Sequence, residues 1–290
     1  MTSTAGSTTP SARPPRAVTR AAVATHGKSA QIGPALARLQ SVAREAGVEL
    51  LFSSDESEKH GLVAANGGET EADIAVVLGG DGTMLRALTR FLGTGVPVVG
   101  VNFGRVGFLS SIPRAELETG LGRVFAGEYE VVVLATLEVV ASDKRSVAVY
   151  DAVVAGAVLG RMIELEWAVG GEVLGLQPCD GLICSTPSGS TAYNLSNGGP
   201  VLMWGLDAMT ITFVAPHSLH ARSLVVPRGS DLIVWNRTPD VNAAVLVDGH
   251  RGAEVGSGGR VVMRLGPDRS LLATLPEATF VRRYRQAFAT

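Results

Sequence analysis

Val77-Leu78-Gly79-Gly80-Asp81-Gly82-Thr83-Met84-Leu85 joins an apolar segment of strand length to a helix-forming segment through a turn rich in glycine. Such a strand–turn–helix unit is typical of parallel α/β sheets, which bind ligands at the carboxyl ends of their strands. The glycines let the backbone approach a bulky anion, and the N–H groups at a helix start point toward it. The turn therefore predicts an α/β domain that handles phosphate.

Asp81 is the informative residue of this turn, because a carboxylate beside a phosphate is repulsive and needs a chemical reason. It can accept a proton from a hydroxyl that attacks phosphorus, or help to hold a metal ion. It can also cap the following helix. Two commoner phosphate motifs are absent, because Ala22 replaces the first glycine of a P-loop ending at Gly27-Lys28-Ser29, and Leu85 replaces the third glycine of the dinucleotide fingerprint.

Strand and helix patterns alternate on both sides of the turn, from residue 17 to residue 127. The predicted strands are Ala17–Ala24, Val48–Phe52, Ile74–Leu78 and Val96–Val101, and the predicted helices are Ile32–Ala46, Thr83–Leu92 and Pro113–Ala126. This alternation predicts a Rossmann-like domain, with a parallel sheet covered by helices on both sides.

A mostly β domain is predicted for residues 128–275, with one short helix at Thr191–Ser196. The predicted strands are Tyr129–Val140, Ser146–Val154, Met162–Val169, Leu182–Ser185, Met209–Val214, Asp231–Trp235, Ala243–Val247 and Arg260–Leu265. Residues 1–16 have the composition of a disordered tail. Residues 276–290 form a C-terminal segment, and its basic run Arg282–Arg285 is interpreted as a solvated helix face.

Composition excludes several classes of protein. The 290 residues are 46% hydrophobic, which is enough for a large core, and the net charge of −2 does not indicate a nucleic-acid binder. Cys179 and Cys184 lack the spacing of a zinc or redox site, so buried free thiols in a reducing compartment are expected. No membrane span and no signal peptide are recognisable, which favours a cytoplasmic protein.

Two further segments carry chemical information. Gly100–Leu109 is another glycine-rich segment at the end of a predicted strand. Cys179–Pro200 comprises a strand, a turn rich in hydroxyl groups and a short helix, and five of the seven residues 185–191 are Ser or Thr. Helix capping accounts for one or two of these hydroxyls, so the others are expected to bind a ribose or a phosphate. Tyr193 can stack on a flat base.

The order and spacing of Gly79–Thr83, Asn102–Leu109 and Asp180–Pro200 resemble those of the NAD kinase family. The segment Pro216–Leu219 with Ala221–Val225 is also similar to a family segment. The likeness covers about residues 70 to 275. The first turn is shared with lipid kinases and phosphofructokinases, whereas the third segment is much more specific.

The resemblance implies transfer of a phosphoryl group from ATP or polyphosphate, with Mg²⁺ or another divalent cation, to the 2′-hydroxyl of the adenosine ribose of NAD. Asp81 is the implied proton acceptor, and no residue is expected to be a metal ligand. The implied phosphate-binding or donor-binding residues are Gly79, Gly80, Gly82, Thr83 and Arg86. The implied NAD-binding residues are Asp81, Gly82, Tyr150, Asp151, Arg161, Asp180, Thr191, Ala192, Tyr193, Asn194, Leu195, Ser196 and His250.

The resemblance also implies that subunits assemble, and this sequence differs from the family at one position of the expected site. In the family, the residue that matches Asp180 reaches the NAD of a neighbouring subunit, which implies a homodimer or a homotetramer. The family has Asn before the acid that matches Asp151, whereas this chain has Tyr150. Two alternatives therefore remain open. One is an NAD-binding regulatory homologue with little or no catalysis, and the other is a lipid kinase of the diacylglycerol type.

Overall fold

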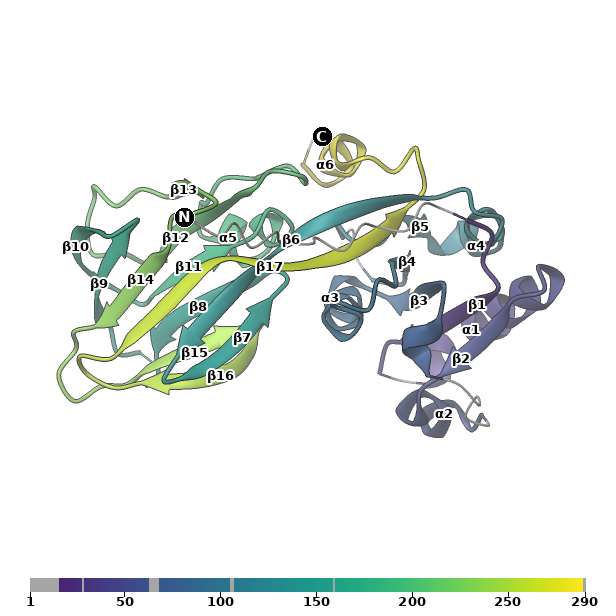
Figure 1. The fold of residues 1–290 in the computed structure, drawn as a ribbon, viewed down its shortest axis with the longest axis horizontal. Helices are drawn as coiled ribbons and strands as arrows, with labels where there is room; N and C mark the ends of the chain where they lie inside the picture. Colours follow the sequence, from purple (N-terminus) through teal and green to yellow (C-terminus); the bar gives the residue numbers. More distant parts are fainter. Residues whose placement is uncertain (1–15, 28, 63–67, 105–106, 159, 289–290) are drawn as a thin grey trace, which may run out of the picture. The chain divides into compact units, whose positions relative to one another are not determined.

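The computed structural model describes residues 16–27, 29–62, 68–104, 107–158 and 160–288 (Figure 1). The described residues form two compact units: a β unit comprising Leu134–Arg269, and an α/β unit comprising residues 16–133 and 270–288. It passes from one unit to the other within β6 (Glu130–Ala141) and within β17 (Arg260–Thr274). The tail predicted for residues 1–16 lies outside the described residues, apart from Arg16.

The α/β unit is built on a parallel sheet in the order β2-β1-β3-β4. The bounds are β1 Arg20–Thr25, β2 Glu49–Phe52, β3 Ile74–Gly79 and β4 Val98–Asn102. Short β5 (Ile112–Pro113) and Leu272 of β17 also pair in parallel with β4. Every residue of β3 is buried, as expected for a central strand covered on both faces.

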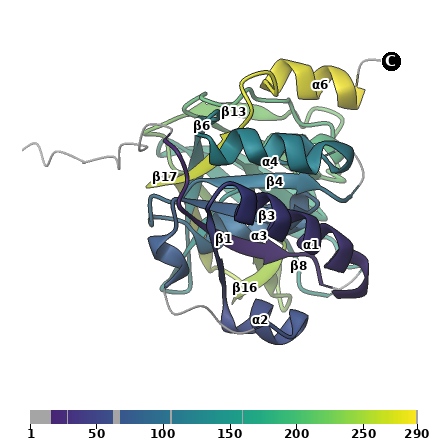
Figure 2. The ribbon, with the colours of Figure 1, turned by 90° about the vertical axis from the view of Figure 1, so that its right-hand side faces the viewer.

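Helices cover this sheet as the sequence predicted. Figure 2 looks onto the face covered by α1 (Ser29–Glu45) and α4 (Leu117–Phe125), whose apolar side chains pack against alternate residues of β3. Helix α3 (Asp81–Arg90) packs on β3 and β4. The remaining helices of this unit are α2 (Ser54–His60), η1 (Glu69–Glu71), η2 (Arg114–Glu116) and α6 (Phe280–Phe288). None of the described helices is both long and apolar enough to cross a membrane.

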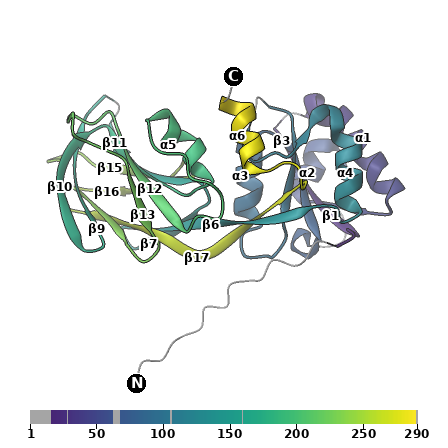
Figure 3. The same ribbon diagram turned by 90° about the horizontal axis from the view of Figure 1, so that it is seen from above.

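The β unit contains two antiparallel sheets with one core between them (Figure 3). One sheet has the order β13-β12-β11-β8-β15-β16, and the other has the order β10-β9-β14-β17, with the β6–β7 hairpin attached through β6. The bounds are β7 Lys144–Ala148, β8 Asp151–Gly156, β9 Ile163–Val169, β10 Glu172–Cys179, β11 Gly181–Ser185, β12 Ala208–Val214, β13 Leu224–Pro227, β14 Leu232–Asn236, β15 Ala243–Val247 and β16 His250–Val255. The predicted fold class, an α/β part followed by a mostly β part, is confirmed.

Several predicted boundaries are wrong. The predicted strand Ser146–Val154 is interrupted at Val149 and Tyr150, because their backbone N–H groups bond to a side chain instead of a neighbouring strand. The predicted helix Thr191–Ser196 is a 3-10 turn, η3 (Gly189–Thr191), followed by the single helical turn α5 (Tyr193–Ser196). Strand β10 was not predicted, since Gly175 and Pro178 interrupt its pattern.

Candidate active site

The Gly79–Thr83 turn connects β3 to α3 as predicted. β3 ends at Gly79, and Gly80 is the residue that precedes the helix. A Cβ atom on Gly79 would lie 2.6 Å from Thr83 Oγ1, so only glycine allows the helix to start this close to the strand. The N–H groups of the first helical residues, Asp81 and Gly82, have no partner within a helix. Gly82 is exposed, so this end of the sheet can receive an anion.

The Asp81 carboxylate accepts two backbone hydrogen bonds from a distant segment. Phe108 N–H donates to Oδ2 at 2.7 Å, and Leu109 N–H donates to Oδ1 at 3.2 Å. No side chain caps α3, so the interpretation of Asp81 as a helix cap is wrong. A carboxylate offers about four lone-pair sites. Half-buried Asp81 therefore keeps acceptor capacity for a ligand hydroxyl while the two amides fix its orientation.

Gly107 makes this arrangement possible. A Cβ atom at Gly107 would lie 2.2 Å from Asp81 Oδ1, which no side chain could avoid without moving the carboxylate. The sequence indicated a glycine-rich segment at this point but not the residue it contacts. Arg105 and Val106 of the same segment lie outside the described residues.

The other predicted phosphate-binding residues lie in the turn or just after it. Thr83 is buried, with its Oγ1 3.5 Å from Nδ1 of His26, which follows β1. Arg86 lies exposed one turn further along α3. Gly80 and Gly104 approach closely, since a Cβ on Gly104 would lie 3.4 Å from Gly80 Cα. The Gly79–Thr83 turn and the segment after β4 thus form one surface at the carboxyl end of the parallel sheet.

In the β unit, Asp248 organises the backbone at the start of β8. Its carboxylate accepts hydrogen bonds from the N–H groups of Val149 (2.8 Å), Tyr150 (2.8 Å) and Asp151 (3.2 Å). Asp248 and Gly249 have positive φ values of 49° and 77°, which form the turn between β15 and β16. His250 Nδ1 lies 3.0 Å from Asp248 O, so the same turn places this predicted residue. Asp248 was not predicted, although an Asp-Gly pair between two apolar runs is a hairpin signal.

Asp151 is almost enclosed, with 7% of its surface exposed. Burial, and secondarily the charge of Asp248, raises the pKa of Asp151 from 3.8 to about 7. Tyr150 is likewise 7% exposed, and its carbonyl accepts a hydrogen bond from Thr186 N–H. The bulky side chain is therefore accommodated in the interior.

The hydroxyl groups of the turn after β11 bond to the protein backbone, whereas the sequence predicted that most of them bind a ribose or a phosphate. Ser185, Thr186, Ser188 and Ser190 are buried, and each donates a hydrogen bond to a backbone carbonyl. Thr186 Oγ1 donates to Val149 O, and Ser190 Oγ donates to Pro187 O, each at 2.7 Å. The argument that these hydroxyls exceed structural needs is therefore wrong, because all five hold the turn against residues 149–150 or against itself. Thr191, the fifth, is only half-buried.

The predicted NAD-binding segment Thr191–Ser196 presents some side chains outward and others inward. Tyr193 is 46% exposed and Ser196 is also exposed. Ala192 and Leu195 are half-buried. Asn194 is fully buried, and its Nδ2 donates to Ser190 O and Pro200 O. Its Oδ1 accepts from Thr212 Oγ1. Asn194 therefore fixes the shape of the segment.

Asp180 and Arg161 lie away from Asp151. Both are exposed and border Gly156, whose N–H donates to Asp180 O and whose added Cβ would lie 2.6 Å from Arg161 O. Gly156 and Asp151 are the two ends of β8. Five steps of an antiparallel strand separate them by about 17 Å. Within one chain, these two residues therefore do not join the group around Asp151.

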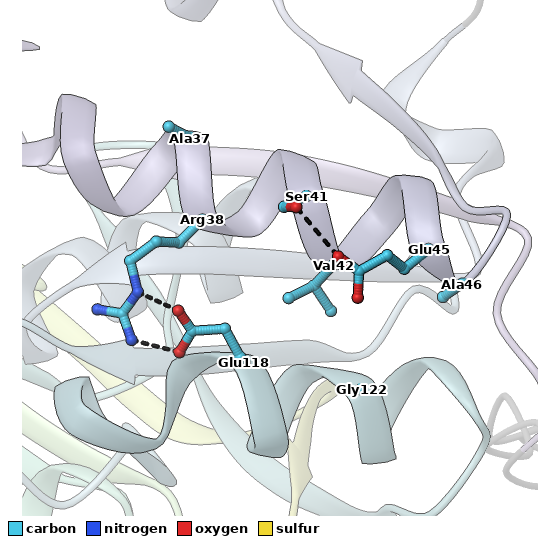
Figure 4. A pocket seen from close by; sticks show the side chains of 8 residues that line it. All are labelled: Ala37, Arg38, Ser41, Val42, Glu45, Ala46, Glu118 and Gly122. Carbon is cyan, nitrogen blue, oxygen red and sulfur yellow. Dashed lines mark hydrogen bonds and ion pairs between the residues drawn. The ribbon is translucent and has the colours of Figure 1, made fainter.

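A cavity elsewhere in the α/β unit contains none of the predicted residues. It lies between α1 and α4, where the side chains of Arg38 and Glu118 form a two-bond ion pair (Figure 4). It is lined by Ala37, Arg38, Ser41, Val42, Glu45, Ala46, Glu118 and Gly122. Among the described residues, no group of three or more His, Cys, Asp or Glu side chains is arranged to hold a metal ion.

Comparison with known families matches both units. The model described as "ATP-NAD kinase N-terminal domain" matches residues 41–129, and the model described as "ATP-NAD kinase C-terminal domain" matches residues 151–275. A similar curated protein is the NAD kinase of Heliobacterium modesticaldum, 39% identical over 74% of this chain and 78% of that protein. Another is NAD kinase 2 of Streptomyces avermitilis, 36% identical over 75% of this chain and 74% of that protein.

Solved structures share the fold. Yeast NADH kinase complexed with NADH superposes with a TM-score of 0.81 at 22% identity, covering 95% of this chain and 89% of that one. An NAD kinase from Archaeoglobus fulgidus in complex with ATP gives a TM-score of 0.72 at 24% identity, covering 93% and 97%.

The raised pKa of Asp151 predicts a pH-dependent stability. Between pH 3.8 and about 7 the folded chain binds a proton that the unfolded chain has released, so the free energy of unfolding falls as pH rises through this window. Asp151→Asn removes that dependence. As pH rises from 5 to 8, the free energy of unfolding of the variant should increase by about 2 kcal/mol relative to that of wild type. Urea unfolding at the two pH values measures this difference. Asp180→Asn, at an exposed carboxylate, is the control. An equal stability difference at both pH values would contradict the assignment.

Proposed function

Because the chain belongs to the NAD kinase family, we propose that Asp81 is the general base of phosphoryl transfer to the 2′-hydroxyl of the adenosine ribose of NAD. The enzyme is an NAD kinase, a phosphotransferase that makes NADP from NAD. The family match leaves no support for a lipid kinase or for a regulatory homologue without catalysis.

One observation carries the assignment of the base. The Asp81 carboxylate lies at the start of α3 and is oriented by the N–H groups of Phe108 and Leu109. It does not cap the helix. An oriented carboxylate can accept the proton of a ribose hydroxyl as that oxygen attacks the terminal phosphorus in line with the leaving oxygen. Most of the rate enhancement would then come from positioning and from fixed dipoles.

The phosphoryl donor is ATP or polyphosphate, held at the same surface by Gly79, Gly80, Gly82, Thr83 and Arg86. The glycines admit the phosphates to the backbone N–H groups, and exposed Arg86 supplies positive charge. Mg²⁺ or another divalent cation is expected to enter with the phosphates of the donor, as part of that substrate.

The residues proposed to bind NAD are named for each unit by itself. Asp81 and Gly82 act from the α/β unit. From the β unit we assign Tyr150, Asp151, Arg161, Asp180, Thr191, Ala192, Tyr193, Asn194, Leu195, Ser196 and His250. Exposed Tyr193 suits stacking on a base, whereas buried Asn194 supports the segment that presents it.

The working form is a homodimer or a homotetramer in the cytoplasm. Asp180 lies at the opposite end of β8 from Asp151, which suits a residue that serves the NAD of a neighbouring subunit. Edge strand β10 exposes Val173, Leu174 and Leu176, an apolar surface that a second copy could cover. The cytoplasmic assignment is supported by the two buried cysteines, which are unpaired.

The base assignment is tested with Asp81→Asn. Asn keeps the shape of the side chain but accepts no proton, so NADP formation should fall about 10²- to 10⁴-fold while NAD still binds. Activity is measured as NADP formed from NAD with Mg²⁺ and either donor, and binding is measured by calorimetry. Full activity in the variant would contradict the assignment, and a wild-type chain that makes no NADP would contradict the proposed function.

Gly107→Ala tests the docking of Asp81 on residues 107–109. The added methyl group would overlap Asp81 Oδ1 and displace the carboxylate, so kcat should fall about 10²-fold with little change in the thermal midpoint. Gly122→Ala is the matched control, because a Cβ there meets nothing within 4 Å. Equal activity of the two variants would show that the position of the carboxylate does not matter.

Shared sites between subunits are tested by mixing two inactive variants. Asp81→Asn lacks the base and Asp180→Ala lacks the residue expected to reach the neighbouring NAD. A mixed oligomer can combine an intact Asp81 with an intact Asp180 at one site. We therefore expect more NADP from the subunit-exchanged mixture than from the sum of the separate variants. A mixture no more active than that sum would argue that each subunit works alone.

A further inference from the structure

The basic run on α6 is not a solvated face throughout, which corrects the interpretation made from the sequence. Arg283 is only 4% exposed, whereas Arg282 and Arg285 on the same helix are exposed. Because a guanidinium is always charged, burying it requires several acceptors. The run therefore contains one residue with a different role from its neighbours.

Arg283 bonds to the segment that holds Asp81. Its Nη1 donates to the carbonyl oxygens of Phe108 (2.7 Å) and Ser110 (2.9 Å). Its Nη2 donates to Thr274 Oγ1 (2.7 Å), and its Nε donates to Ala278 O (3.0 Å). The guanidinium thus ties residues 108–110 to β17 and to the start of α6, all within the α/β unit.

The backbone of Phe108 takes part in both sets of contacts. Its N–H donates to the Asp81 carboxylate and its C=O accepts from Arg283. Since the peptide groups on either side of Phe108 are planar, a shift of the carbonyl segment also moves the amides. The Phe108 ring adds a second attachment to α6, with ring centroids 5.7 Å from Phe280 and 5.5 Å from Phe288.

We propose that Arg283 is a positioning residue for phosphoryl transfer, which sets the orientation of the Asp81 carboxylate through the backbone of residues 108–110. This inference rests on the proposed role of Asp81. It gives the C-terminal helix α6 a place in the reaction that its sequence distance from the Gly79–Thr83 turn does not suggest. Arg283 does not contact Asp81 directly, so its effect depends on Asp81 being the base.

The first test separates turnover from substrate binding. Arg283→Met keeps most of the side-chain volume but donates no hydrogen bonds. We expect kcat to fall about 10- to 100-fold, with KM for NAD changed less than about twofold. Arg285→Met, on the exposed side of the same helix, should leave both constants unchanged. A loss confined to KM, or an equal loss in the Arg285 variant, would overturn the proposal.

The second test asks whether Arg283 acts through Asp81. In an Asp81→Asn background, Arg283→Met should reduce the residual rate less than about twofold, because the group it positions is already absent. A purely structural role would lower the rate by the same factor in both backgrounds. That result would reject the proposal.

A third measurement does not require activity. Hydrogen exchange of the peptide containing Phe108 and Leu109 should become faster in Arg283→Met and remain unchanged in Arg285→Met. If wild type makes no NADP, the proposed function fails, while this measurement still tests the structural link. If Arg283→Met does not fold, Arg283→Lys replaces it in all three tests, since Lys supplies charge without the planar fork. Unchanged exchange and unchanged kcat would overturn the inference.

Discussion

Two hydrogen bonds, from the N–H groups of Phe108 and Leu109 to the Asp81 carboxylate, are the constraint on which the chemistry of the α/β unit depends. They join the turn after β3 to the segment that follows β4, so two neighbouring parallel strands contribute to one site. Gly79 permits the short connection into α3, and Gly107 leaves the space that the carboxylate occupies. Both glycines therefore help to position the Asp81 side chain. Its two hydrogen bonds leave acceptor capacity for a substrate hydroxyl.

The β unit uses the same device for a different purpose. The Asp248 carboxylate accepts three consecutive backbone N–H groups, ends the ladder before β8 and sets where Asp151 begins that strand. The buried hydroxyls of Ser185, Thr186 and Ser188 then hold the adjacent turn against the carbonyls of residues 149–150. In both units a carboxylate bound by backbone amides fixes a loop at the end of a strand, where regular sheet pairing cannot do so.

The sequence predicted the parallel sheet, the β-rich second half and the Gly79–Thr83 turn, because these depend on local periodicity and on glycine. It could not predict that Asp81 bonds to residues 27 and 28 positions away, or that Arg283 alone of its basic run faces inward, since both depend on tertiary packing. The hydroxyls of residues 185–190 were misjudged for a related reason. Composition shows how many donors a turn has, but not how many backbone carbonyls the fold leaves for them.

A crystal structure of the enzyme with NAD bound tests the central claim most directly. The account predicts that Asp81 keeps its bonds to the N–H groups of Phe108 and Leu109 while a carboxylate oxygen lies about 3 Å from the 2′-oxygen of the adenosine ribose. A ribose hydroxyl bound away from Asp81, or a carboxylate that leaves residues 108–109 when NAD binds, would contradict it.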